Sequence, residues 1–392
     1  MILESHHNFI CNTYEFVKNI IEIIGGSVMK IEQIDKNFIV NTNFTEPDII
    51  WYNVREIPFE LNGVFYDETQ GRFLRIPQSV AENISKEVVI LNTHTSGGRV
   101  SFKTNSSYIA INAMMDPAVF MPHMPLTGQA GFDIYRKIEG KETYFKTFVP
   151  PTNWENGYTL GTKTLSDFTD YTINFPLYHG VKELYIGLKK NAILEAPITY
   201  KNNVPVVFYG NSITQGGCAS RPGNSYQGFL SRRLSMNFIN LGFSGSGKGE
   251  SVMAEYIADI DMSVLVMDYD SNAPTAEHLK LTYYPFYKTV RDKNPNLPII
   301  LISHPSALHG VCYKTMTNYE DWGTFKKRKE VIKSTYNQAL ADGDKNIYFI
   351  DGSEIFKGEE WDAVTVDGTH PNDFGFLRFA QYLERYLKPL LK

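Results

Sequence analysis

The feature that most constrains the fold is an alternation of short apolar runs and amphipathic stretches after residue 203. Five runs, "VPVVFYG", "NFINLG", "VLVMDY", "PIILIS" and "IYFID", are continuously apolar, which is typical of strands buried on both faces. Helical patterns lie between and after them; from Phe376 to Leu390, for example, the apolar side chains recur on one helix face. This order predicts an α/β fold with a doubly wound parallel sheet.

The chain before residue 200 has a different pattern, in which short strand-like runs alternate with turn residues. Examples are "NFIVNTNF", "VSFKTNSSYIAINAMM", "YFKTFVPP", "DYTINF" and "KELYIGLKK". This spacing predicts an all-β domain, a β-sandwich or jelly roll, over residues 1–200. An amphipathic helix is expected at its start, from Tyr14 to Ile24. The α/β domain then covers residues 201–392, and the join is expected around "EAPITYKNNVP".

Charge and cysteine content limit the possible partners and compartments. The formal net charge of −5 and the absence of a Lys/Arg tract leave no basic surface for nucleic acid. Three scattered cysteines without a C-x-x-C pair are typical of a reducing compartment. The N-terminus lacks the basic and apolar regions of a signal peptide, and no apolar run is long enough to span a bilayer. We therefore expect a cytoplasmic protein that binds neither nucleic acid nor membranes; its oligomeric state stays open.

Polar and glycine residues follow the apolar runs at the positions where a parallel sheet collects its ligands. Ser212 follows the first run in "YGNSITQGG", and Gly242 ends the second in "NLGFSGSGKGES". Asn272 follows the third in "DYDSNAP", while Asp367 and His370 lie in "DGTHPND" before the last helix. A serine at a strand-to-helix turn could equally be a helix N-cap. It is the set of motifs, in this order, that indicates an active site.

These motifs together resemble the SGNH/GDSL esterase and lipase family. Gly210 to Ser212 match its Gly-Asp-Ser block, although Asn211 replaces the usual aspartate. Gly242 matches the lone glycine of the second block, and Asp367 with His370 match the Asp-x-x-His block. Asn272 is assigned to the third block, which here reads "DYDSNAP" in place of Gly-x-Asn-Asp. The resemblance covers Val204 to the C-terminus and implies an SGNH hydrolase domain.

The N-terminal half carries a second resemblance. "GFDIY", Gly131 to Tyr135, is similar to the GxDLY signature of a β-sandwich domain that precedes the esterase domain in one branch of this family. That branch resembles carbohydrate O-deacetylases. The resemblance implies a two-domain esterase that acts on short-chain, acetyl esters of carbohydrates.

Elementary chemistry assigns a role to each of these residues. His370 could take the proton of the Ser212 hydroxyl, and Asp367 could fix the tautomer of His370 and stabilise the imidazolium. The backbone N–H groups of Ser212 and Gly242 and the side-chain amide of Asn272 could donate to the oxyanion of the tetrahedral intermediate. No cofactor or metal is required. The substrate is expected to be a small ester or an acetylated oligosaccharide. Tyr283, Tyr284 and Tyr287 could stack on a sugar, while packing on the helix face is the alternative role for at least one of them.

Four alternatives remain at this level. "GFSGSGKG" approaches a phosphate-binding loop, but Gly249 stands where a Ser or Thr is needed. "VLVMDYDSN" is similar to the strand end of phosphatases with an aspartate nucleophile, yet Asn272 stands where Thr or Val belongs. "DYDSNA" lacks the glycine of a calcium-binding loop, and His304 and His309 have no accompanying metal-ligand pattern. A non-catalytic carbohydrate-binding protein is the remaining alternative, because aromatic residues make up 14% of the chain.

Overall fold

The computed structural model describes residues 31–36, 39–40, 44–305 and 319–391. The chain divides into two compact units, Met1–Asn41 and Thr42–Lys392. In the first unit the described residues include one short helix, α2 (Ile31–Ile34). The helix expected from Tyr14 to Ile24 lies outside the described residues.

A five-stranded parallel sheet forms the centre of the C-terminal half, with strand order β14-β13-β15-β16-β17. Every neighbouring pair in it is parallel, which confirms the predicted doubly wound fold. Its strands are β13 (Asn202–Gly210), β14 (Met236–Gly242), β15 (Val264–Asp268), β16 (Ile299–Ile302) and β17 (Ile347–Ile350). Because β13 lies between β14 and β15, the strand order reverses at β13. The end of β13 is therefore the topological switch point, where ligands bind in sheets of this kind.

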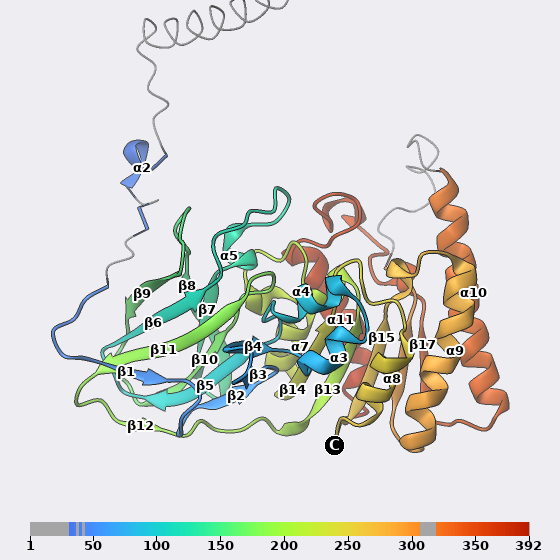
Figure 1. Cartoon of the computed structure of the whole chain (residues 1–392), viewed down its shortest axis with the longest axis horizontal. Helices are drawn as coiled ribbons and strands as arrows, with labels where there is room; N and C mark the ends of the chain where they lie inside the picture. The colour runs from blue at the N-terminus through green and yellow to red at the C-terminus, as the bar shows by residue number, and fades with distance from the viewer. Residues whose placement is uncertain (1–30, 37–38, 41–43, 306–318, 392) are drawn as a thin grey trace, which may run out of the picture. The chain divides into compact units, whose positions relative to one another are not determined.

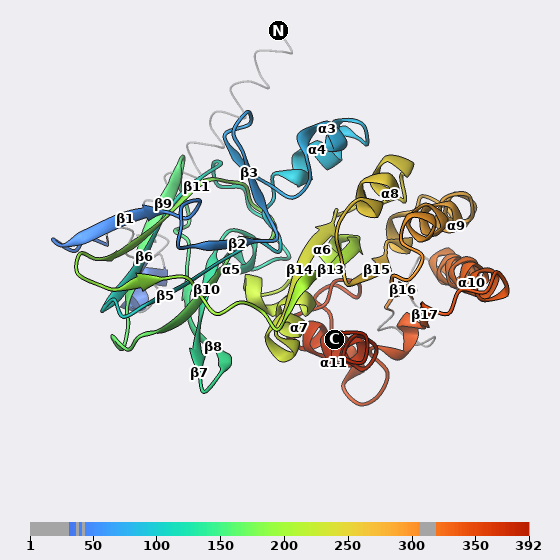
Figure 2. The same ribbon diagram turned by 90° about the horizontal axis from the view of Figure 1, so that it is seen from below.

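Helices cover both faces of this sheet (Figures 1 and 2). They are α6 (Ser212–Gln215), α7 (Tyr226–Leu234), α8 (Ser251–Ala258), α9 (Ala276–Lys293), α10 (Tyr319–Ala341) and α11 (Asp373–Leu387). Val207 and Tyr209 on β13 pack in one apolar cluster with α8, α9 and α10. Val206 and Phe208, which alternate with them, pack in a second cluster with α7 and α11. Burial on both faces explains why the five runs are continuously apolar.

Two antiparallel sheets make up the N-terminal half, with strand orders β1-β11-β6-β9 and β12-β5-β10-β7-β8; β2 pairs with β5 and β3 with β4. The strands of the first are β1 (Ile49–Asn53), β6 (Tyr108–Met115), β9 (Gly157–Lys163) and β11 (Val181–Lys189). The others are β2 (Glu60–Asn62), β3 (Phe65–Asp67), β4 (Arg72–Leu74), β5 (Arg99–Thr104), β7 (Phe132–Ile138), β8 (Lys141–Phe148), β10 (Thr169–Asn174) and β12 (Leu194–Glu195). Phe132 on β7 meets Tyr158 on β9 with ring centroids 6.3 Å apart, so the two sheets pack through an aromatic core. This confirms the predicted β-sandwich.

One predicted strand is not formed by the residues that the structure describes. In "NFIVNTNF", residues 39, 40 and 44 are irregular. Phe44 instead packs its ring against Gly161 and lies 5.7 Å from the ring of Tyr108. Phe44 thus packs on the face of the sheet through its side chain, and β1 is the first strand of the chain among the described residues.

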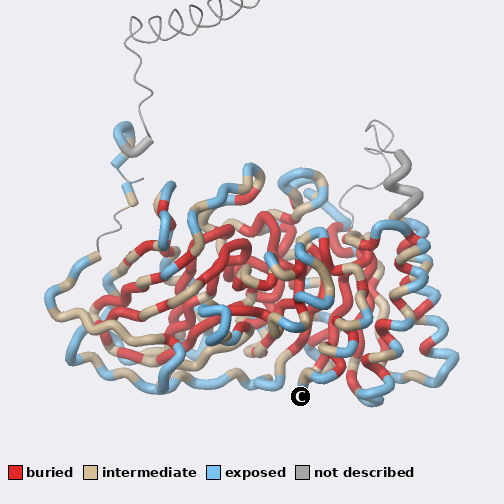
Figure 3. Tube along the Cα trace, viewed as in Figure 1, coloured by how far each residue is buried: buried red, intermediate tan, exposed pale blue. Residues whose placement is uncertain are grey.

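The β-sandwich and the parallel sheet belong to the same compact unit, and buried residues run from one into the other (Figure 3). Three short helices, α3 (Gln78–Glu82), α4 (Lys86–Asn92) and α5 (Leu126–Gln129), lie in the N-terminal half. Ala81 on α3 and Val88 on α4 join the same apolar cluster as α8. The domain boundary at residue 200 stays a prediction. None of the helices in the described parts of the chain is long and apolar enough to cross a membrane.

Candidate active site

Ser212 is the first residue of α6, directly after the end of β13. The helix begins there because the Asn211 side chain caps it: Asn211 Oδ1 accepts hydrogen bonds from the N–H groups of Ile213, at 2.8 Å, and Thr214, at 3.3 Å. The alternative prediction, in which Ser212 is the N-cap of the helix, is therefore wrong, because Asn211 has that role. The Ser212 hydroxyl is free to act elsewhere.

The Ser212 hydroxyl lies in a chain of hydrogen bonds that ends at Asp367. The distance from Ser212 Oγ to His370 Nε2 is 2.9 Å, and His370 Nδ1 lies 2.7 Å from Asp367 Oδ2. Because an ionised carboxylate can only accept, the proton of His370 lies on Nδ1, and Nε2 presents a lone pair to the Ser212 hydroxyl. Ser212 and His370 are 158 residues apart in sequence. The structure nevertheless brings together the three predicted catalytic side chains.

Asp367 is held in its ionised form by its own loop. Burial pushes the pKa of Asp367 upward, but hydrogen bonds from the backbone N–H and the imidazole of His370 and from the Thr369 N–H outweigh burial and leave that pKa lowered. The His370 N–H donates to Asp367 Oδ1 at 2.8 Å, so the same carboxylate orients both the backbone and the ring of His370. The Asp-x-x-His spacing allows this double contact.

The structure places Gly242 differently from the prediction. Its N–H donates to Asn240 Oδ1 at 2.9 Å and is therefore not available to an oxyanion. A side chain at this position would meet the Gln215 N at 2.2 Å, so Gly242 is required for close packing of β14 against α6. The predicted role of Gly242 as a hydrogen-bond donor is thus not supported, because its N–H group already has a partner.

The turn that follows Gly242 leaves one backbone donor free. From Gly242 to Gly249, every N–H except that of Gly245 donates to a carbonyl, a hydroxyl or a side-chain oxygen. Gly245 is exposed, its φ is +67°, and no atom would contact a side chain there. A phosphate cradle needs several free N–H groups, so the structure does not form one. Gly245, which the sequence motifs did not single out, therefore carries the N–H in this turn that is open to a ligand.

Asn272 lies against the same turn. It ends a short 3-10 helix, η3 (Asp270–Asn272), that follows β15. Its side-chain Nδ2 donates one hydrogen to the Phe243 carbonyl at 3.0 Å, which leaves the second hydrogen for a substrate. The neighbouring Ser271 hydroxyl accepts from Asn211 Nδ2 at 3.2 Å. These bonds hold the loops after β13, β14 and β15 together.

The N-terminal half contributes side chains to this region. The Tyr178 hydroxyl donates to the Ser212 carbonyl at 3.2 Å, and the His123 ring centroid lies 5.6 Å from that of His370. Arg75 is buried and donates to the carbonyls of Asn240 and Gly242, so it braces the strand end that leads into the Gly245 turn. Burial lowers the pKa of Arg75 to about 9.

Two buried carboxyl groups lie behind the site. Burial, and then the charge of Asp270, raises the pKa of Asp268 well above its usual range; burial likewise raises the pKa of Asp270 to about 6. Asp268 is fully buried and accepts from the Thr214 hydroxyl at 3.2 Å, so it cannot act as a carboxylate nucleophile. The aspartate-phosphatase alternative is therefore not supported. His304, buried and bonded to Ser271 Oγ at 2.9 Å, serves the same structural network.

Two of the three tyrosines considered for stacking on a sugar have the helix-packing role instead. Tyr283 and Tyr287 on α9 are buried in the apolar cluster beneath the helix. Tyr284 is only partly buried, but its hydroxyl donates to Asp342, directly after the end of α10, at 2.9 Å. Tyr283 and Tyr287 are therefore not available to a sugar, whereas Tyr284 also lines a surface pocket formed by α9 and α10.

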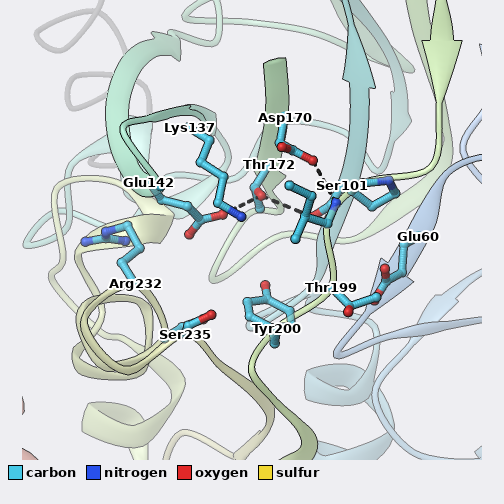
Figure 4. Close-up of a pocket in the computed structure, with 14 residues that line it drawn as sticks. Glu60, Ser101, Lys137, Glu142, Asp170, Thr172, Thr199, Tyr200, Arg232 and Ser235 are labelled. Carbon is cyan, nitrogen blue, oxygen red and sulfur yellow. Dashed lines mark hydrogen bonds between the residues drawn. The ribbon is translucent and has the colours of Figure 1, made fainter. Parts of the chain in front are cut away.

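A separate polar pocket lies between the β-sandwich and α7 (Figure 4). Its cavity measures about 50 Å³ and is lined by residues such as Glu142, Asp170, Thr172, Tyr200 and Arg232. Thr172 Oγ1 donates to Glu142 Oε1 at 2.6 Å, so part of its polar lining is already paired. The pocket shares no residue with the Ser212 region, and its volume suits water rather than a substrate.

Two family models match the chain and together cover both halves. The GDSL-like lipase/acylhydrolase family matches residues 203–388, and the N-terminus of Esterase_SGNH_hydro-type, GxDLY, matches residues 49–194. No curated protein matches the sequence.

Several solved structures share the fold. A GDSL-like lipase from Bacteroides ovatus ATCC 8483 is 30% identical, with a TM-score of 0.76 over 88% of this chain and 98% of that chain. The salicylyl-acyltransferase SsfX3 from a tetracycline biosynthetic pathway is 18% identical, with a TM-score of 0.71 over the same shares of the chains. A family two carbohydrate esterase from Cellvibrio japonicus is 12% identical, with a TM-score of 0.55 over 88% of this chain and 98% of that chain.

The identity to the Bacteroides ovatus lipase extends over nearly the whole of that protein, and both family models belong to one two-domain arrangement. The chain is a member of the GDSL-like lipase/acylhydrolase family.

Proposed function

We propose that this protein is a serine esterase that removes short acyl groups, acetyl above all, from hydroxyls of carbohydrates. The observation that carries the proposal is the chain of hydrogen bonds from Ser212 Oγ through His370 to Asp367. A carbohydrate-binding protein without catalysis has no need of a hydroxyl, an imidazole and a carboxylate aligned in this way.

The reaction proceeds through an acyl-enzyme. Ser212 Oγ bonds to the ester carbonyl carbon while its proton passes to His370 Nε2. The carbon–oxygen bond to the alcohol then breaks, and His370 returns the proton to the leaving oxygen. Water, deprotonated by His370, next attacks the acyl carbon; the acid is released and Ser212 recovers its proton.

The negative charge on the former carbonyl oxygen needs donors that are already in place. Three candidates lie on the loops after β13, β14 and β15: the Ser212 N–H, the Gly245 N–H and the second hydrogen of Asn272 Nδ2. The Ser212 N–H is suited to this role because the first N–H groups of a helix have no partner within the helix. One such donor typically contributes a factor of about 10²–10³ to the rate.

A short acyl group is favoured by the compact loops around the site. Only residues 243–250 separate β14 from α8, and residues 269–275 separate β15 from α9. The first turn is closed by its own hydrogen bonds, and neither loop has an apolar insertion that could wall a long acyl tunnel. Several carbohydrate esterases share the fold, at identities that make this a likeness of fold alone.

The test is a panel of acetyl, butyryl and octanoyl esters together with acetylated oligosaccharides, assayed with the wild type and Ser212→Ala. We expect Ser212→Ala to lose about four orders of magnitude in kcat or more, since a triad without its nucleophile fails as a unit. Ser251→Ala is the matched control: Ser251 is also the first residue of a helix after a strand, but it is exposed and has no catalytic partner.

Three outcomes would each contradict a different part of the proposal: the nucleophile, the length of the acyl group, or catalysis itself. Full activity of Ser212→Ala would overturn the nucleophile. A preference for octanoyl esters would overturn the short acyl group. Binding of acetylated oligosaccharides by the wild type without release of acetate would favour the non-catalytic carbohydrate-binding protein.

A further inference from the structure

Three side chains around the catalytic base form a cluster that the proposed esterase chemistry does not use as a set. They are His123, Cys218 and His370, and one ligand atom from each, two imidazole nitrogens and the thiol sulfur, lies within 4.8 Å of the other two. The cluster joins three separate segments: a loop of the β-sandwich, the turn after α6, and the loop before α11. Two imidazoles and a thiolate are a ligand set that binds Zn²⁺ and similar borderline-soft divalent ions.

The hydrogen bonding of His370 suits a metal ligand. Its Nδ1–H donates to Asp367 Oδ2, so Nε2 is the nitrogen whose lone pair is free to coordinate. A histidine that binds a metal almost always donates its other ring N–H to a carboxylate or carbonyl, because this fixes the tautomer and raises the basicity of the ligand nitrogen. The same arrangement that prepares His370 as a base prepares it for a metal.

Cys218 is held beside His370 by an unusual backbone. Its φ is +74°, a region that L-residues other than glycine seldom adopt, and its side chain is 2% exposed. It follows two glycines, and a side chain at Gly217 would lie 3.4 Å from His370 Cδ2, the ring atom bonded to Nε2. The turn thus directs a sulfur toward the Nε2 side of His370, at a position where glycine would fit without strain.

His123 lies on a loop that is anchored on both sides. Ahead of it, the Met121 N–H donates to Gln129 Oε1 at 3.1 Å. Directly after it, Met124 is buried in the apolar cluster that also contains Ile213 and Cys218. The side chain of His123 is accessible to solvent between these anchors, so a small rotation can shorten its distance to the other ligands.

We propose that His123, Cys218 and His370 bind a Zn²⁺-like divalent ion, with the fourth position open to water, and that this ion reversibly inhibits the enzyme. Metal binding replaces the thiol proton of Cys218, which passes to solvent, with a sulfur–metal bond. Coordination by His370 Nε2 occupies the lone pair that would otherwise accept the Ser212 proton. The metal-bound and the catalytically competent states are therefore mutually exclusive.

Metal binding can be measured without any activity. The full-length Ser212→Ala protein, treated with chelator and dialysed, is titrated with Co²⁺ while absorbance is followed. We expect one equivalent to bind with a sulfur-to-metal charge-transfer band in the near ultraviolet. That band should disappear when Cys218→Ala is added to Ser212→Ala and remain when Cys11→Ser is added in its place. Absence of the band in the parent protein would overturn the proposed site, whatever the enzyme hydrolyses.

The second experiment tests inhibition by the metal, and only this experiment rests on the proposed esterase function. The rate of ester hydrolysis of each protein is measured at increasing Zn²⁺ concentrations and divided by the metal-free rate of the same protein. Addition of a chelator should restore the rate. His123→Ala and Cys218→Ser should each raise the half-inhibitory concentration by at least about tenfold. His278→Ala, a histidine on α9 bonded to the Lys248 carbonyl, should leave it unchanged. Equal inhibition of all four proteins would show that the ion acts elsewhere and overturn the inhibitory role.

Discussion

At the scale of single residues, the proposed chemistry depends on which atoms of His370 carry a proton. Asp367 accepts from the ring Nδ1 and from the backbone N–H of the same histidine, so it determines both tautomer and orientation. A hydrogen-bond donor at position 367 would favour the opposite tautomer, with the proton on Nε2, where it would face the Ser212 hydroxyl.

Asp367→Asn should therefore lower kcat by roughly 10³–10⁴ with little change in KM. The amide keeps the size of the carboxylate, so the loss measures the tautomer and the charge rather than packing. Steady-state kinetics on an acetyl ester provide the measurement. Glu359→Gln, in the nearby exposed loop, is a control for the change of charge, and a fall of less than tenfold in Asp367→Asn would remove Asp367 from the triad.

Asn272 is the second residue whose role can be measured alone. Its Nδ2 has one hydrogen on the Phe243 carbonyl and one left over, so Asn272→Ala should lower kcat by about 10²–10³ and change KM less. Loss of the Phe243 contact also affects stability, so thermal unfolding is measured in parallel. Unchanged kcat in a folded variant would show that the oxyanion is held by backbone N–H groups alone.

At the scale of elements, the strand end before the Gly245 turn is braced from the N-terminal half. Arg75 donates to the carbonyls of Leu91, Asn240 and Gly242, and among the described residues it has no carboxylate partner. Its guanidinium also lies 4.3 Å from the centroid of the Phe243 ring. A planar group with several donors can satisfy all of these carbonyls, whereas a lysine can reach only some of them.

Arg75→Lys should consequently lower kcat by about tenfold or more, because the turn that carries Gly245 loses its support. Arg72→Lys is the matched control, since Arg72 lies three residues away and pairs with Asp116 at the surface. The kinetics are compared well below the unfolding temperature of both variants. If Arg75→Lys only lowers that temperature and keeps its kcat, Arg75 stabilises the fold without positioning the turn.

The loop after β15 should make stability depend on pH. Burial raises the folded pKa of Asp270 to about 6, above its unfolded value, so the folded protein holds this proton more tightly than the unfolded chain. The contribution of Asp270 to the free energy of unfolding is then fully present below the unfolded pKa and is lost as the pH rises to about 6. Between these values the free energy of unfolding falls by at most about 1.4 kcal/mol per pH unit. Denaturant unfolding of wild type and Asp270→Asn between these limits should show a smaller decline in the variant. Parallel pH profiles would contradict the shifted pKa.

At the scale of the whole molecule, the GxDLY-type segment joins the β-sandwich to the catalytic half. Asp133 on β7 is fully buried and accepts from Arg221 Nη1 at 3.0 Å, the Gly223 N–H at 2.9 Å and Asn174 Nδ2 at 2.7 Å. Tyr135, two residues on, also bonds to Arg221. The loop from Arg221 to Gly223 follows the turn of Cys218, so the motif holds the neighbourhood of the active site from the other half of the chain.

Asp133→Asn should destabilise the protein by about 3 kcal/mol. All three partners of Asp133 are donors, so either orientation of the amide turns an NH₂ group against another donor. Asp292→Asn provides the comparison, because Asp292 forms only an exposed ion pair with Lys288 on α9, and its loss should cost less than about 1 kcal/mol. Denaturant unfolding of the two variants measures the difference. Equal, small losses would show that the motif does not join the two halves.

The sequence by itself predicted the parallel sheet and the three side chains of the proposed triad. Short, continuously apolar runs that alternate with helical patterns are typical of strands in a covered parallel sheet, so they predicted β13 to β17. The position of Ser212 directly after the first of them predicted its place at the ligand-binding edge, and the spacing of Asp367 and His370 was short enough to be read locally.

The tertiary structure alone decided what depends on contacts between distant segments. Gly242 ends β14 and Gly245 lies in the turn after it, and only the structure shows that the Gly242 N–H is occupied by Asn240 Oδ1 and the Ser244 N–H by the distant Gln215 side chain. The tyrosines of α9 have a helical spacing that fits either face, and the packing of α10 decided that they are buried or paired there. His123 and Cys218 are separated by the end of the β-sandwich and the start of the parallel sheet. Their meeting with His370 depends on how the chain folds back, because local sequence patterns specify the conformation of a segment but not its neighbours.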